Sequence, residues 1–169
     1  MAYIIVEPIV GSQPIADTST VQRHPLGKIV RAVDPTYGEG EFIYLLGVGS
    51  TVIGSAVSYN ISTYQTALAP VGTGVPRAIA FAMSANVASQ WGWYQISGLV
   101  VAKKALATSM ATGISVGIKT IGLVSATASL QCMHGAVVAA VSSAKSSTSN
   151  TTILLMCNRP TMQGPETLA

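Results

Sequence analysis

The sequence predicts an all-β protein: an antiparallel β-sandwich or β-barrel of about nine or ten short strands with an extended N-terminal arm. β-Branched apolar residues outnumber leucine, with 18 Val and 14 Ile against 11 Leu, and such side chains fit a pleated sheet better than a helix. Short apolar runs alternate with Gly, Pro and Asn, and none shows a clear helical stripe. A solenoid or a mixed α+β fold is the alternative, but no fixed long repeat supports the solenoid.

The chain of 169 residues has the length of one domain. We expect an arm over residues 1–25, a single β-domain over residues 26–160 and a C-terminal tail over residues 161–169. Three prolines in the arm exclude a helix or a long strand there. Its first segment, residues 3–6, is apolar and strand-like, so we expect the arm to lie on an apolar surface; a disordered terminus is the alternative.

The domain opens with a predicted strand over residues 27–33, a turn over 34–38 and a strand over 41–46. Because residues 41–46 are apolar on both faces, we expect that strand to be covered on both sides. Residues 51–59 form the next candidate strand, in which Gly54 marks a bulge or a close approach of another backbone.

Two strictly alternating segments follow. Residues 78–83 alternate alanine with larger apolar side chains, which is the period of a strand, and the alanine face would let another sheet or subunit approach closely. Residues 91–97 repeat the alternation and place Trp91 and Trp93 on one face. A further apolar run, residues 99–104, comes next.

The C-terminal part predicts three more strands, at residues 114–124, 131–142 and 152–158. Residues 142–151 are rich in Ser, Thr and Asn and predict a loop. Residues 105–112 are the one place where a short helix competes.

Charge is the most informative bulk property. Lys and Arg number 9 and Asp and Glu number 6, so only 9% of the residues are charged, against a usual share of about 25%. The excess cations are spread along the chain, which gives little support to nucleic-acid binding. We therefore expect an exterior that is partly covered by other polypeptides.

A membrane location does not account for the apolar balance. Residues 46–76 and 120–144 carry little or no charge, yet polar residues, Gly or Pro interrupt both before about 20 apolar residues accumulate. The N-terminus lacks the basic region of a secretion signal. We expect the protein to be made in the cytoplasm and not to bind or cross a membrane.

The sequence offers few candidate catalytic residues. The acids are six and the histidines two, and no nucleophile elbow or phosphate-binding loop occurs. Cys132, His134 and Cys157 could hold zinc, but their spacing is unlike a paired-ligand motif, so core thiols and a surface histidine are the preferred interpretation. We expect that the protein is not an enzyme and that it binds no cofactor and no metal.

The aromatic residues Trp91, Trp93 and Tyr94 could stack on bases or sugars. No cluster of cations is interleaved with them, so packing in the core or at a subunit interface is favoured. The sequence-predicted interface residues share an apolar or aromatic character and are Tyr3, Ile4, Ile5, Val6, Trp91, Trp93 and Tyr94.

Residues 23–34, 40–45 and 92–98 resemble a group of small structural proteins of tailed phages, the head decoration or cement proteins. The resemblance covers residues 23–104 well and the C-terminal third loosely. It carries no site motif that could be transferred residue by residue.

The resemblance implies a β-rich protein on the outer surface of the virion head, made in the host cytoplasm, which locks capsid subunits together against internal DNA pressure. It also implies the major capsid protein and further copies of the chain, as a homotrimer, as partners. The arm would then add to a neighbour's sheet edge. The rival interpretations are another phage structural role, at a head-fibre base or in the tail, and a carbohydrate- or receptor-binding β-sandwich that uses the tryptophans.

Overall fold

The computed structural model describes residues 3–7, 11–71, 77–85, 87–106, 108–126, 132–139 and 151–162. Twelve strands connected in one hydrogen-bonded sheet make up the regular structure of these residues, which include no helix. The all-β prediction is therefore confirmed. No helix among the described residues is long and apolar enough to cross a bilayer.

The strands, in chain order, are β1 Ile4–Ile5, β2 Thr18–Ser19, β3 Ile29–Asp34, β4 Gly38–Leu46, β5 Ala56–Tyr59, β6 Thr66–Leu68, β7 Arg77–Ala82, β8 Trp91–Lys103, β9 Ser115–Thr120, β10 Leu123–Ala126, β11 Cys132–Val138 and β12 Thr152–Met162. Their order across the sheet is β1-β3-β4-β8-β7-β12-β11-β9-β10, with β2 paired to β8 and β5 paired to β6 and β7. All ladders between these strands are antiparallel.

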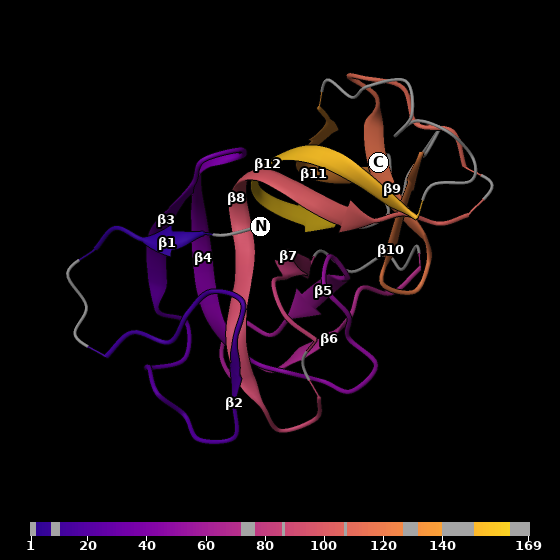
Figure 1. The fold of residues 1–169 in the computed structure, drawn as a ribbon. Helices are drawn as coiled ribbons and strands as arrows, with labels where there is room; N and C mark the ends of the chain where they lie inside the picture. The colour runs from indigo at the N-terminus through magenta and orange to yellow at the C-terminus, as the bar shows by residue number, and fades with distance from the viewer. Residues whose placement is uncertain are drawn as a thin grey trace, which may run out of the picture.

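The central strand is β8, which has 13 residues and serves both parts of the molecule. Its first half pairs with β4 and its second half with β12, and it turns between them (Figure 1). Gly98 lies at the turn with φ +95°, and a Cβ there would come within 2.5 Å of the Glu39 carbonyl oxygen. Only glycine fits this backbone without strain, so the predicted runs 91–97 and 99–104 are one bent strand.

Three apolar clusters form the core of the part of the chain that the structure describes. The largest lies in the C-terminal part, between the inner sides of β8, β9, β11 and β12 and residues of β5 and β7. A second contains Phe42, Tyr44 and Trp93, and a third contains Ile43, Leu45 and Tyr94. Alternate residues of β4 thus point into different clusters, and the prediction that this strand is covered on both faces is confirmed.

The N-terminal arm lies on its own domain. Ile4 and Ile5 of β1 pair with Val33 and Ala32 of β3, and β2 pairs with the start of β8. Tyr3 and Ile15 are buried in the cluster that contains Trp93. The arm thus lies on an apolar surface, as expected, and that surface belongs to its own chain. Among the described residues, β1 pairs along one edge only, with β3.

Several element boundaries differ from the sequence-based ones. Residues 114–124 span a tight hairpin, β9 and β10, because Gly122 takes φ +72° at the turn. The described part of residues 105–112 is not helical. Strand β12 continues to Met162 through pairing with β7, so the predicted tail starts inside a strand. Most of the predicted loop 142–151, and residues 163–169, lie outside the described residues.

Candidate interaction surfaces

Three of the five acids in the described part of the chain make structural contacts. Asp34 is buried and its Oδ1 accepts the backbone N–H groups of Thr36 at 2.7 Å and Tyr37 at 3.0 Å, which fixes the β3–β4 turn. Glu39 and Glu41 form ion pairs with arginines. These contacts give the three carboxylates structural roles in the β3–β4 hairpin and beside it.

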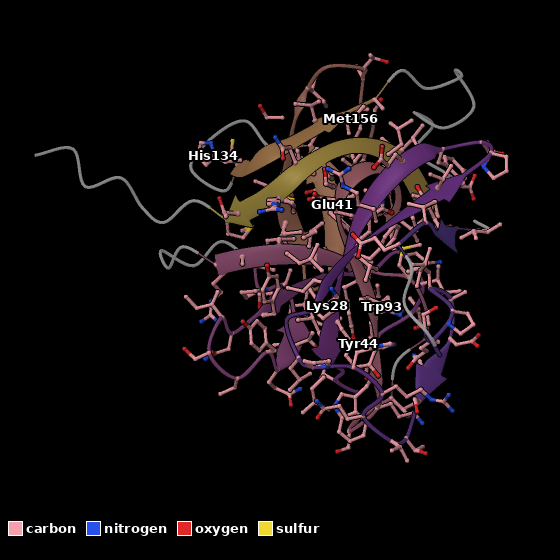
Figure 2. All side chains as sticks on the ribbon, turned by 90° about the vertical axis from the view of Figure 1, so that its left-hand side faces the viewer. Lys28, Glu41, Tyr44, Trp93, His134 and Met156 are labelled. Atoms are coloured by element: carbon pink, nitrogen blue, oxygen red, sulfur yellow. The ribbon has the colours of Figure 1, made fainter. Side chains whose placement is uncertain are left out.

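The three zinc candidates do not face one another. Cys157 is buried in the core, and burial raises the pKa of its thiol to about 12. His134 is exposed on β11 (Figure 2), while Cys132 is half-buried as a free thiol. No group of three His, Cys, Asp or Glu side chains in the described part of the chain is placed to hold a metal ion.

The predicted aromatic interface residues lie mostly inside the protein. Trp93 and Tyr94 are fully buried and Trp91 is partly buried. The Trp93 ring lies beside that of Tyr44, with centroids 4.9 Å apart (Figure 2). Trp93 and Tyr94 therefore cannot contact a partner while this fold is intact, which corrects the sequence-based assignment.

Gln13 and His24 fasten the arm over Trp93. The Gln13 backbone N–H donates to His24 Nε2 at 3.1 Å, and Trp93 Nε1–H donates to the Gln13 carbonyl at 2.9 Å. The Tyr44 hydroxyl donates to Gln13 Oε1 at 3.0 Å. Neither Gln13 nor His24 was singled out from the sequence, because a buried glutamine in a proline-rich arm has no recognisable pattern.

The first segment of the arm divides between core and solvent. Tyr3 is buried, with its hydroxyl donating to the Leu99 carbonyl at 2.9 Å. Ile5 is half-buried, whereas Ile4 and Val6 are 69% and 55% exposed. Of the sequence-predicted interface residues, Ile4 and Val6 are thus the two most available to a partner.

Ile4, Val6 and Val33 form an exposed apolar edge strip. Ile4 lies directly opposite Val33, which is also exposed, and the Val6 N–H donates to the Arg31 carbonyl at 3.1 Å. Strand β1 lies at one end of the strand order of the described residues. An edge strand offers backbone groups for pairing with another chain.

A second apolar surface lies on β8, β12 and β11. Val101 is opposite Leu154, and Leu99 is opposite Met156, which in turn is opposite Val137. Directly opposed residues share one face of a sheet. We call these five residues the outer face: Leu99, Val101, Val137, Leu154 and Met156.

The outer face points away from the core. The residues that alternate with it, such as Val100, Leu155 and Val138, are buried in the largest cluster. Met156 and Val137 are 48% and 44% exposed, and the other three members are half-buried. Apolar residues on both faces of a strand predict cover on both sides, so this pattern could have been found in the sequence at residues 99–102 and 153–157.

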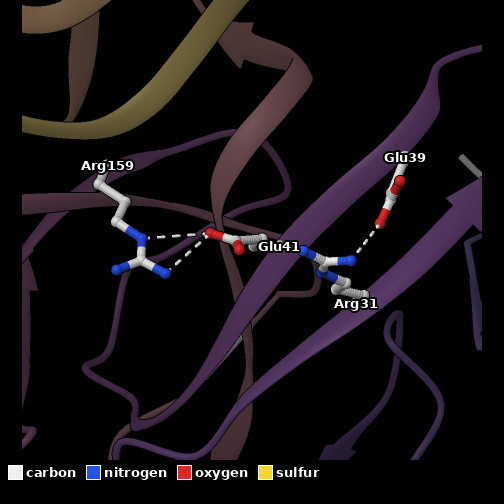
Figure 3. Close-up of polar contacts among 4 residues, drawn as sticks. All are labelled: Arg31, Glu39, Glu41 and Arg159. Carbon is white, nitrogen blue, oxygen red and sulfur yellow. Dashed lines mark hydrogen bonds and ion pairs between the residues drawn. The ribbon is translucent and has the colours of Figure 1, made fainter. Parts of the chain in front are cut away.

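A charged groove of about 520 Å³ lies between the two apolar surfaces. Its lining residues come from four strands and are Arg31, Glu39, Gly40, Glu41, Ser97, Asn158 and Arg159. Arg31 Nη1 lies 3.5 Å from Glu39 Oε1, and Arg159 Nη2 lies 3.2 Å from Glu41 Oε2 (Figure 3). The four charges cancel, so the groove is polar but electrically balanced.

The opposite end of the outer face meets an apolar hollow. Val101 and Lys103 of β8 line it together with Val52 and Ile53 of the β4–β5 connection. Gly54 fixes this connection against β8, because its carbonyl accepts the Lys103 N–H at 2.7 Å. The predicted close approach at Gly54 is confirmed. An apolar centre with polar groups at its margin is the usual composition of a protein–protein interface.

Comparisons with protein-family models, curated proteins and solved structures give no match for this chain.

Proposed function

We propose that this chain is a non-enzymatic structural virion protein, which decorates the outer surface of a phage head and stabilises the capsid by bridging neighbouring subunits. Its partners would be the major capsid protein and further copies of itself. The observation that carries the proposal is an apolar edge strip on β1, which lies at one end of the sheet formed by the described residues, in a chain with few charges.

The edge strip suits strand addition by a capsid segment. Backbone groups on the outer side of β1 would supply hydrogen bonds, and the alternating side chains of Ile4 and Val6 would set the register. Repetition of this modest contact over a shell multiplies its effect through avidity. The arm therefore acts as part of the docking surface while it remains folded on its own domain.

The carbohydrate-binding alternative loses its main support. A sugar-stacking platform needs exposed aromatic faces, whereas Trp93 and Tyr94 are fully buried. The two remaining sequence-level arguments for the structural role, the low charge and the resemblance to decoration proteins, are unaffected by this.

The test is binding to undecorated heads of the phage that encodes the chain. We expect the double variant Ile4→Lys, Val6→Lys to lose most head binding in a co-sedimentation assay, since two lysines oppose burial of the strip. Ile61→Lys is the matched control, because Ile61 is 73% exposed in the β5–β6 turn and should bind heads like the wild type.

Point substitutions are preferable to deletion of the arm. Removing residues 1–20 would also remove Gln13 and Ile15 and uncover Trp93, so loss of binding could follow from unfolding. Unchanged head occupancy by the folded double variant would contradict the proposed docking surface, and a wild-type protein that ignores heads would contradict the function.

A further inference from the structure

The second half of the N-terminal arm covers the aromatic cluster around Trp93 with few contacts of its own. We call this segment, residues 11–24, the strap. Only Gln13, Ile15 and His24 of the strap are buried. Its strand β2 has two residues and pairs with the first two residues of β8. Segments with so few buried contacts open at a lower free-energy cost than core strands do.

Gln13 attaches the strap to the domain, and His24 holds Gln13 in place. The Gln13 carbonyl accepts the Trp93 indole N–H at 2.9 Å, and its side chain bonds to the Tyr44 hydroxyl and the Trp91 carbonyl. The Gln13 backbone N–H donates to His24 Nε2 at 3.1 Å. Since Gln13 and His24 lie near opposite ends of the strap, this bond closes it into a loop against the Trp93 ring.

The groups around the His24 ring oppose a positive charge on it. Only a neutral imidazole accepts the Gln13 N–H, and protonation would set two N–H groups against each other. The charges that act on the ring, those of Arg23 and Lys28, are both cationic. Asp17, the acid of the strap, has an exposed side chain, and its backbone carbonyl accepts Gln13 Nε2–H at 2.7 Å. A proton on His24 therefore weakens the closed strap.

The aromatic rings beside His24 act in the other direction, but more weakly. The Tyr44 and Trp93 centroids lie 5.1 and 5.2 Å from the His24 ring, within the distance of about 6 Å over which an aromatic ring attracts a cation. Burial raises the pKa of Tyr44 above its ordinary value of 10.0, so this residue brings no charge at neutral or acid pH. Desolvation by burial dominates at His24 and lowers its pKa.

We propose that the strap is an acid-sensitive cover: protonation of His24 releases residues 11–24 from Trp93 and Tyr44 while the strands of the domain stay paired. In the released state the Trp93 indole N–H loses the Gln13 carbonyl, and both aromatic rings meet solvent. Strand β1 keeps its pairing with β3, because those backbone bonds do not involve the strap. The inference is independent of the proposed function, and a protein that ignores phage heads would leave it standing.

The binding of one proton sets the size of the effect. The released chain binds it with the ordinary pKa of 6.5, whereas the closed chain binds it with a lower pKa. The equilibrium constant for opening therefore rises about tenfold for each pH unit below 6.5, until the folded-state pKa is reached. Above pH 6.5 the opening does not depend on His24.

The first experiment measures amide hydrogen exchange by nuclear magnetic resonance on the purified full chain, between about pH 7.5 and about pH 5. The reference is Ala56, which is buried in the largest cluster and whose N–H donates to the Gly122 carbonyl at 2.9 Å. We expect the protection factor of the Gln13 N–H to fall about tenfold per pH unit below 6.5 and to stay about a hundredfold or more below that of Ala56. Equal protection of the two amides would show that the strap leaves only when the whole domain unfolds, and would overturn the inference.

The second experiment assigns the pH dependence to His24. His24→Gln removes the titrating group, so the protection of the Gln13 N–H should no longer depend on pH, whereas His134→Gln, at an exposed histidine, should keep the wild-type dependence. Circular dichroism verifies that both variants are folded. The wild type provides a test that needs no variant: the Trp93 indole N–H resonance should shift with the same midpoint as the His24 ring protons. A His24 titration that leaves the Trp93 resonance unchanged would refute the release.

Discussion

At the scale of single residues, the burial of His24 decides how the arm responds to pH. Its Nε2 accepts a hydrogen bond from the Gln13 N–H, and its ring lies 5.1 Å from that of Tyr44 and 5.2 Å from that of Trp93. Only the neutral imidazole can accept this bond. Desolvation by burial, and then the charges of Arg23 and Lys28, lower the pKa of His24 from its ordinary value of 6.5.

This lowered pKa predicts a loss of stability in mild acid. The unfolded chain binds a proton on His24 more readily than the folded chain, so the stabilisation is complete above pH 6.5 and is lost as the pH falls through the folded-state pKa. We expect the thermal midpoint to fall between about pH 7 and pH 5, and to fall less in His24→Gln. His134→Gln, at an exposed histidine, should retain the wild-type pH dependence; equal behaviour of the two variants would contradict the assignment.

At the scale of elements, the arm shows how one short strand can serve both the core and the surface. In β1 and the residues beside it, successive side chains alternate between the cluster around Phe42 and solvent. The Tyr3 ring packs at 4.8 Å from the Phe42 ring. Stability therefore depends on one side of the segment and partner binding on the other.

A pair of neighbouring substitutions separates these two roles. Tyr3→Ala should lower the free energy of unfolding of the isolated chain by about 3 kcal/mol, as large-to-small changes of buried aromatic residues do. Ile4→Ala removes a side chain that is 69% exposed and should change it by less than about 0.5 kcal/mol. Urea titration of both variants measures the difference, and equal effects would show that the arm is not folded on its own domain.

At the scale of the whole molecule, shared strands join the core clusters. β8 contributes Trp93 to one cluster, Tyr94 to a second and Val100 to the largest. β7 likewise contributes Phe81 to the largest cluster and Ala82 to another. The clusters therefore share strands, and one cluster cannot lose its packing without exposing a strand that also packs in another.

This sharing predicts a single cooperative unfolding transition. Both tryptophans lie at the start of β8 and belong to or pack against the cluster that contains Phe42 and Tyr44. Their fluorescence therefore reports on that cluster, whereas far-ultraviolet circular dichroism reports on all strands. We expect the two thermal curves to coincide at concentrations where the chain is monomeric. A fluorescence transition separate from the dichroism transition would mean that the cluster around Trp93 unfolds independently of the remaining strands.

Local patterns were sufficient for most strands but not for their limits. The strict alternation at residues 78–83 and the doubly apolar run at 41–46 each correspond to a strand, because those periods follow from the backbone itself. The division of residues 114–124 into two strands depended on a positive φ at Gly122, which the apolar pattern around it concealed.

The candidate surfaces were only partly accessible to prediction. All four of Ile4, Val6, Trp93 and Tyr94 were predicted to be interface residues. Ile4 and Val6 are exposed, whereas Trp93 and Tyr94 are buried. A tryptophan side chain is favourable both in a protein core and at a subunit interface, so residue type does not distinguish the two environments. The arm residue Gln13, which covers Trp93, is 80 positions away in the sequence.

The all-β class, the low charge and the apolar character of both faces of the central strands follow from residue type and period, which are local properties of the chain. Which apolar residues are covered depends on the folded arrangement of the strands. Burial depends on contacts between distant segments: the arm closes over Trp93, while Met156 and Val137 meet in register with only solvent above them in the described structure.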